Sequence, residues 1–186
     1  RYVVATDVKD VIFQGNPSDY LNIADMRCQD LVVSSEAIAY QHEPWGANNL
    51  LKSFGPIMYE KHKQETIINC GVLAGKFSAF MGLCKSVYLL SMGTVQHVPG
   101  GGGPDQAALN LLLSTSVYDH ITDVTTHRGT WAAQLGTTLD PNKIEAYKSF
   151  LTEPQPLWDG VENVLKNATG EKFTIVHQWD RVPEVR

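Results

Sequence analysis

Short apolar runs, bounded by polar or turn-forming residues, recur along the chain and predict β-strands. They fall at residues 2–6, 11–13, 31–35, 67–75, 121–126 and 173–176. The second run is followed by Gly15-Asn16-Pro17-Ser18, which is a turn signal. The run at 67–75 also ends in a predicted tight turn, because Gly75 closes it.

Three segments between these runs carry helical signals: residues 45–54, 77–92 and 104–113. The first is closed by Gly55-Pro56, a helix stop. The third begins with Pro104 and Asp105, because proline suits the first turn and an acid there complements the helix dipole. Strands that alternate with helices predict an α/β fold, with a mixed, mainly parallel sheet flanked by helices. The polar stretch at 140–170 is expected at the surface.

Composition limits the class of protein. With 186 residues, 43% hydrophobic, the chain is expected to form one domain with a packed core. A net charge of −5 argues against a duplex nucleic-acid binder. No apolar run is long enough to predict a membrane span. Cys28, Cys70 and Cys84 form no CxxC motif, so neither a disulfide framework nor a zinc knuckle is expected.

The sequence does not decide the cellular compartment of the protein. The chain begins with Arg1 at the edge of a predicted strand, so we expect a trimmed or processed chain. Cysteine usage favours the cytoplasm, and the Golgi lumen is the alternative. Asn167-Ala168-Thr169 is a glycosylation sequon, but such triplets also arise by chance.

Two carboxylates, Asp7 and Asp10, follow directly on the first predicted strand. Acids at the end of a buried strand are costly unless a cation neutralises them, and Mg²⁺ or Mn²⁺ prefers such oxygen ligands. In open α/β sheets ligands gather at the carboxyl ends of strands. The alternative is a solvated turn in which Lys9 pairs with a neighbouring acid. The residues alone leave both interpretations open.

His177 ends the last predicted strand. It is either a core histidine or a metal ligand through one ring nitrogen, with the other nitrogen held by an acceptor. Two carboxylates and a histidine form a common mixed shell for Mn²⁺. The metal interpretation of His177 therefore gains weight from Asp7 and Asp10.

Three further segments, and a run of glycines, are candidates for contact with a ligand. Gln106 and Asn110 lie four residues apart on one helix face beside Asp105, where they either bind sugar hydroxyls or serve helix capping. Gly71 lies two residues after Asn69 in a predicted strand. It either allows a ligand to approach the backbone closely or forms a tight turn. Trp45 either packs on a sugar or belongs to the core. The glycines at 100–103 are expected to form a loop over a site.

These residues resemble a known family. Thr6-Asp7-Val8-Lys9-Asp10-Val11-Ile12-Phe13-Gln14 resembles the DxD motif region of nucleotide-sugar transferases with the GT-A fold. Asn69-x-Gly71-Val72-Leu73-x-Gly75, Asp105-Gln106-x-x-x-Asn110 and Val176-His177-Gln178-Trp179-Asp180-Arg181 are similar to later motifs of that family, in the family's order. Within it, the chain is most similar to the transferase domain of large algal-virus (chlorovirus) glycosylation proteins.

The resemblance implies a Rossmann-like GT-A fold and transfer of a sugar from a UDP- or GDP-sugar to a glycan or glycoprotein hydroxyl. Asp7, Asp10 and His177 would hold Mn²⁺ or Mg²⁺, and the two acids would also contact the diphosphate or ribose. Asp105 would touch hydroxyls and act as general base in an inverting enzyme, and Gln106 would lie near the anomeric carbon. The remaining donor contacts would come from Asn69, Gly71, Asn110 and Arg181.

Two departures qualify the resemblance. The acids are spaced Asp-x-x-Asp rather than Asp-x-Asp, which leaves open which of them binds the metal directly. The βα units that hold the nucleobase should precede the acids, and we expect the chain 1–186 to lack them. A nucleotidyltransferase or pyrophosphorylase, and a non-catalytic carbohydrate-binding domain of the same fold, are the alternative functions.

Overall fold

The computed structural model describes residues 1–22, 29–94 and 102–185. Its strands are β1 (Tyr2–Thr6), β2 (Val11–Phe13), β3 (Leu31–Ala39), β4 (Thr66–Lys76), β5 (Thr122–Thr125), β6 (Ala132–Gln134), β7 (Leu157–Asp159), β8 (Val164–Lys166) and β9 (Ile175–His177). Its helices are α1 (Pro17–Leu21), α2 (Pro44–His62), α3 (Phe77–Met92), α4 (Asp105–Leu113), α5 (Ser116–Asp119), α6 (Leu135–Thr138) and α7 (Ile144–Tyr147), with short 3-10 helices η2 (Tyr40–His42), η3 (Trp179–Arg181) and η4 (Pro183–Val185). Cys28, Gly100 and Gly101 lie outside the described residues, so only the second half of the expected glycine loop, Gly102 and Gly103, is described.

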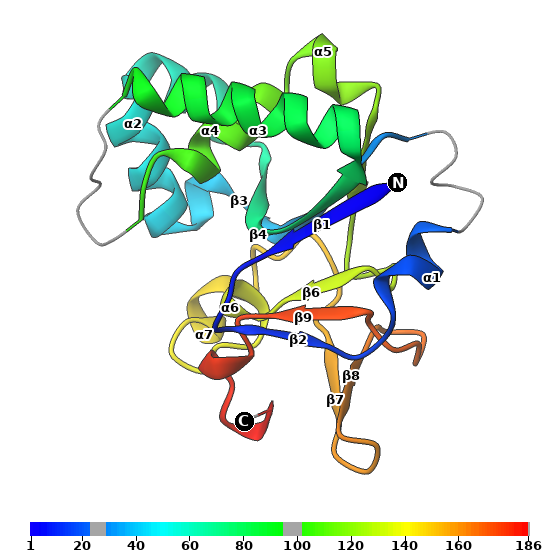
Figure 1. The fold of residues 1–186 in the computed structure, drawn as a ribbon. Coiled ribbons are helices and arrows are strands. Elements are labelled where there is room, and N and C mark those ends of the chain that lie inside the picture. The colour runs from blue at the N-terminus through cyan, green and yellow to red at the C-terminus, as the bar shows by residue number, and fades with distance from the viewer. Residues whose placement is uncertain (23–28, 95–101, 186) are drawn as a thin grey trace.

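Two sheets organise the fold (Figure 1). The four-stranded sheet has the order β1-β4-β3-β5, in which β4 is antiparallel to both neighbours and β5 is parallel to β3. The three-stranded sheet has the order β2-β9-β6, with β9 antiparallel to β2 and parallel to β6. A hairpin of β7 and β8 completes the strands of the described residues.

The predicted α/β class, with a mixed sheet flanked by helices, is confirmed, but the expectation of a mainly parallel sheet is wrong. The connection between β3 and β4 explains the error. Ala39, the last residue of β3, pairs with Thr66, the first residue of β4. The helical excursion between them therefore leaves and returns at the same end of the sheet, so the two strands run antiparallel.

The four-stranded sheet is covered on both faces, which explains why every residue of β3 is buried. Leu31 and Val33 pack with α3 and α4, whereas Val32 points the other way, towards Trp131 and Ile175 of the lower layer. Figure 1 shows α2, α3 and α4 above this sheet and the β2-β9-β6 sheet below it. A strand buried on both faces favours apolar residues on both sides, as at Leu31–Val33 and Ala37–Ala39, and β3 also buries the polar residues Ser34, Ser35 and Glu36 between them.

Helix boundaries follow local signals closely. The helix expected at 77–92 is α3, and Pro104 is the N-cap residue of α4. The stop at Gly55-Pro56 breaks α2, because Gly55 has φ +82°, although a second helical segment continues to His62. The expected turn at Gly15–Ser18 instead leads into α1, whose first turn is capped by the Asn16 side chain.

The stretch at 140–170, expected at the surface, contributes buried side chains as well. Tyr147 and Leu165 are buried in two different apolar clusters, and the Asn167 side chain is fully buried. Cys70 and Cys84 are free, partly buried thiols. None of the helices in the described residues has the length and hydropathy that spanning a bilayer requires.

Candidate metal centre and adjoining cavity

Strand pairing brings the two acids to His177. Asp7 follows β1, and its N–H donates to the carbonyl of Gly71 on β4 at 2.9 Å. Asp10 precedes β2, whose first residue, Val11, pairs with His177 of β9. The N–H of Gln178 donates to the carbonyl of Asp10 at 2.7 Å. Asp7 and Asp10 thus occupy the crossing between the two sheets, next to the end of β9.

The three side chains converge. The Nε2 atom of His177 lies 3.2 Å from Asp7 Oδ2 and 3.6 Å from Asp10 Oδ2. One potential ligand atom from each residue lies within 4.8 Å of the others. His177 is buried, Asp10 is largely covered, and the side chain of Asp7 is 58% exposed. The cluster therefore opens to solvent on the Asp7 side, where a ligand can approach.

Gln134 determines which nitrogen of His177 faces the acids. Parallel pairing of β6 with β9 places Gln134 beside His177. The Gln134 amide donates through Nε2 to Ser34 Oγ at 2.6 Å, so its Oε1 accepts from His177 Nδ1 at 2.7 Å. In the neutral imidazole, Nε2 then has a free lone pair. That lone pair and the two carboxylates are all acceptors, and a cation is the partner that satisfies them together.

Burial also favours the neutral imidazole. It lowers the pKa of His177 below its ordinary value, whereas Asp10 and Asp7 act in the opposite direction. His127 supports the arrangement from behind, since its Nε2 accepts from the Gln134 backbone N–H at 2.9 Å. Burial lowers the pKa of His127 to about 4, so it remains neutral and able to accept at neutral pH. His127 is thus a positioning residue, and it lies in no motif by which the sequence would single it out.

Gly71 provides the space that the cluster needs. A Cβ atom at this position would lie 2.7 Å from His177 Nε2 and 2.8 Å from Asp7 Oδ2. Any side chain here would displace a candidate ligand. The sequence offered a close approach of a ligand to Gly71 or a simple turn, and the structure shows a close approach of the two neighbouring side chains.

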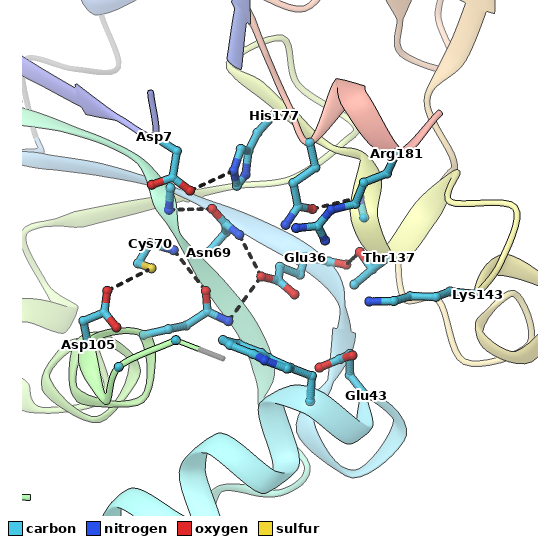
Figure 2. Close-up of a pocket in the computed structure, with 17 residues that line it drawn as sticks. Asp7, Glu36, Glu43, Asn69, Cys70, Asp105, Thr137, Lys143, His177 and Arg181 are labelled. Atoms are coloured by element: carbon cyan, nitrogen blue, oxygen red, sulfur yellow. Dashed lines mark hydrogen bonds and ion pairs between the residues drawn. The ribbon is translucent and has the colours of Figure 1, made fainter. Parts of the chain in front are cut away.

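A cavity of about 530 Å³ adjoins the cluster. Figure 2 shows Asp7 and His177 at one end and Glu43 and Lys143 at the other, with Glu36 between them. The described residues that line the cavity are Asp7, Glu36, Glu43, Trp45, Asn69, Cys70, Gly71, Gly102, Gly103, Asp105, Gln106, Gly136, Thr137, Lys143, His177, Gln178 and Arg181. This volume is in the range of small-molecule sites.

Most residues implicated by the resemblance lie on this wall: Asp7, Asn69, Gly71, Asp105, Gln106, His177 and Arg181. Asp10 does not line the cavity but belongs to the cluster with His177. Asn110 is not on the wall. Its amide accepts from the Ile68 N–H and donates to the carbonyls of Ile68 and Gln106. Asn110 thus holds α4 against β4, in place of the donor contact expected from the sequence.

Trp45 belongs to the cavity wall rather than to the core, and 36% of it is exposed. Its indole approaches Gly102, where a Cβ atom would lie 2.9 Å from Trp45 Cζ2. Trp131, by contrast, is fully buried between the two sheets. An exposed aromatic face on a polar cavity is suited to an amphipathic ligand such as a sugar.

Glu36, which the sequence analysis did not select, lies at the centre of the cavity. Its Oε1 accepts from Asn69 Nδ2 at 2.8 Å and from Gln106 Nε2 at 3.3 Å. Burial raises the pKa of Glu36 to about 7. An available signal was the position of this acid between the apolar segments 31–33 and 37–39, since a carboxyl group buried in a strand there needs a partner or a role.

No family model matches the chain, and no curated protein matches it.

Proposed function

We propose that the chain is the metal- and donor-binding part of a GT-A-type glycosyltransferase, which moves a sugar from a nucleoside diphosphate sugar to a hydroxyl of a glycan or glycoprotein. The observation that carries this proposal is the convergence of Asp7, Asp10 and the Nε2 lone pair of His177 at the mouth of a polar cavity. The ordered set of motifs that resembles the GT-A family supports it.

The chemistry of the donor set fits Mn²⁺ or Mg²⁺. Asp7, Asp10 and His177 would hold the ion, and the nitrogen ligand favours Mn²⁺ over Mg²⁺. When bound, such an ion acts as a Lewis acid that stabilises negative charge on a departing diphosphate. The exposed side of the cluster, at Asp7, leaves room for phosphate oxygens.

The charged side chains that line the cavity distinguish a region suited to phosphate from a region suited to an uncharged sugar. Arg181 lies on the wall near the cluster, where its guanidinium suits a phosphate. Glu36 and Glu43 lie deeper, where two carboxylates face one cation, Lys143, and so disfavour phosphate. We therefore place the diphosphate between the cluster and Arg181, and the uncharged sugar against Glu36.

Asp105 is the exposed acid at the first turn of α4, and its Oδ2 accepts from the Cys70 thiol at 3.7 Å. Because it borders the cavity and solvent, it can take the proton from an acceptor hydroxyl, as an inverting transfer requires. A general base of this kind contributes about 10²–10⁴-fold to the rate. Gln106 lies one residue on and is buried against Glu36.

The proposal is tested by incubating the protein with Mn²⁺, a panel of UDP- and GDP-sugars and a mixture of glycan acceptors that supply the hydroxyl, and by measuring the released product. We expect nucleoside diphosphate, and its release should stop on addition of EDTA. Asp7→Asn should abolish release, and it should fold because the Asp7 side chain is 58% exposed. Asp119→Asn, an exposed acid of α5 outside the cavity wall, is the matched control.

Three outcomes would count against the proposal. Pyrophosphate as the product would favour a nucleotidyltransferase. Release that is indifferent to EDTA, or equal in Asp7→Asn and Asp119→Asn, would remove the metal site from the reaction. Binding of sugars without any turnover or metal dependence would favour a non-catalytic carbohydrate-binding domain.

A further inference from the structure

The backbone around Glu36 is held in an uncommon conformation. Ala37 has φ +60°, in the left-handed region that non-glycine residues rarely adopt, and the register between β3 and β4 shifts between Ser35 and Ala39. Two hydrogen bonds hold this irregularity. The Ala37 N–H donates to Ser35 Oγ at 2.8 Å, and Thr137 Oγ1 donates to the Glu36 carbonyl at 2.6 Å. Such strain is found where surrounding structure directs a side chain to a site.

The carboxyl group of Glu36 is half engaged. Both amides that donate to Oε1 are themselves fixed: Asn69 Oδ1 accepts from the Gly71 N–H at 2.7 Å, and Gln106 Oε1 accepts from the Cys70 N–H at 3.3 Å. Among the described residues, no hydrogen bond reaches Glu36 Oε2. The residue is only 6% exposed and lines the cavity. A rigid acceptor thus faces the cavity without a protein partner.

Glu43 provides the contrast. It lines the same cavity, but both of its oxygens are engaged, by the Gly46 N–H at 2.5 Å and by the Tyr147 hydroxyl at 3.0 Å. Those bonds cap α2 and anchor α7, so Glu43 has a structural role. Glu36 is therefore the carboxyl group of this end of the cavity that lacks a partner on one side. Because Oε2 of Glu36 faces the cavity, a ligand bound there can donate a hydrogen bond to it.

We infer that Glu36 determines sugar specificity: its Oε2 accepts a hydrogen bond from a hydroxyl of the donor sugar, whose apolar face lies against Trp45. This inference rests on the proposed function and names the subsite for the sugar. The position fits the order of groups in a nucleoside diphosphate sugar, because three successive hydrogen bonds, through Asn69 and Gly71, connect Glu36 to Asp7 of the metal cluster. A site built to bond a hydroxyl rejects analogues in which that hydroxyl is absent or misplaced.

Glu36→Gln isolates the role. The amide oxygen of the new side chain can accept from Asn69 and Gln106 as Oε1 does, while its NH₂ group replaces the acceptor that faces the cavity. Binding of UDP, UDP-glucose, GDP and GDP-mannose is measured by calorimetry with Mn²⁺ present, for the wild type, Glu36→Gln and the exposed control Glu60→Gln. For whichever nucleotide binds, we expect the Kd of the nucleoside diphosphate to change by less than about twofold in Glu36→Gln. The Kd of the sugar nucleotide should rise by about tenfold or more.

The outcomes separate the two proposals. If no nucleotide binds the wild type with Mn²⁺, the proposed function fails and this inference fails with it. If nucleotides bind but Glu36→Gln keeps the wild-type affinity for the sugar nucleotide, only the inference fails. Equal loss of affinity for both ligands would show a structural role of Glu36 and would also overturn the inference. As a second readout, the ratio of kcat/KM for UDP-glucose over UDP-galactose should move towards one in Glu36→Gln.

Discussion

Replacing Glu36 by glutamine should change how the stability of the protein depends on pH. Burial raises the pKa of Glu36 from 4.5 to about 7 in the folded state. Below pH 4.5 the carboxyl group is neutral in both states, and above pH 7 it is ionised in both, so the folded state then holds a buried charge. At about 1.4 kcal/mol per pKa unit, this difference destabilises the folded protein by about 3 kcal/mol at high pH. Glutamine stays neutral throughout.

The assay is urea unfolding followed by tryptophan fluorescence from pH 4 to pH 8, for the wild type and Glu36→Gln. Subtracting the free energy of unfolding of Glu36→Gln from that of the wild type cancels the titrating groups that the two proteins share. These include Glu43 and Lys143, which act on Glu36 through space. We expect the wild type to lose about 3 kcal/mol relative to Glu36→Gln between pH 4.5 and pH 7. Glu184→Gln, an exposed control, should stay within about 0.5 kcal/mol of the wild type at every pH. A difference that is flat with pH, or that favours the wild type as pH rises, would refute the reasoning.

Three further predictions concern the metal cluster and its support. Gly71→Ala places a Cβ atom 2.8 Å from Asp7 Oδ2, so Mn²⁺ affinity should fall by more than about tenfold in calorimetry, and unchanged affinity would contradict the geometry. Gln134→Met removes the acceptor of His177 Nδ1 at similar volume, and we expect about 10–100-fold weaker Mn²⁺ binding with an unchanged far-ultraviolet dichroism spectrum. Burial lowers the pKa of His127 from 6.5 to about 4. The neutral imidazole therefore contributes to the stability of the fold above pH 6.5, and this contribution is lost as the pH falls to 4. The wild type should therefore lose about 3 kcal/mol relative to His127→Gln in urea unfolding over that range, and parallel curves would argue against a buried neutral imidazole.

The parts of the fold that follow from nearby residues were predictable. The bounds of α3 follow from its own periodicity, and the start of α4 follows from Pro104. The direction of the strands could not be predicted, because it depends on the end of the sheet to which a connection returns. The pairing of Ala39 with Thr66 is a contact between the two ends of a helical excursion, and no pattern within β3 or β4 encodes it. The three-residue strand β6 is too short to show alternation at all.

The candidate site divides in the same way. Asp7 and Asp10 stand out because two acids end an apolar strand, and His177 because it ends another. Gln134 has no such signal, since its role comes only from its register beside His177. Asn110 was expected to contact the donor, whereas its amide bonds to Ile68 and Gln106. Helical spacing gives the face that Asn110 shares with Gln106, but not the strand against which that face packs. Glu36 was overlooked because the predicted strand ended at residue 35, whereas β3 continues through Glu36 to Ala39.

The most direct test of the metal centre is pulsed electron paramagnetic resonance on Mn²⁺-loaded protein, with and without ¹⁵N-labelled histidine. Coordination by His177 Nε2 predicts nitrogen modulation that changes with the label and disappears in His177→Gln. Asp7→Asn and Asp10→Asn should weaken Mn²⁺ binding in the same samples. Bound Mn²⁺ without histidine modulation, or modulation that persists in His177→Gln, would contradict the assignment of Asp7, Asp10 and His177 as one metal site.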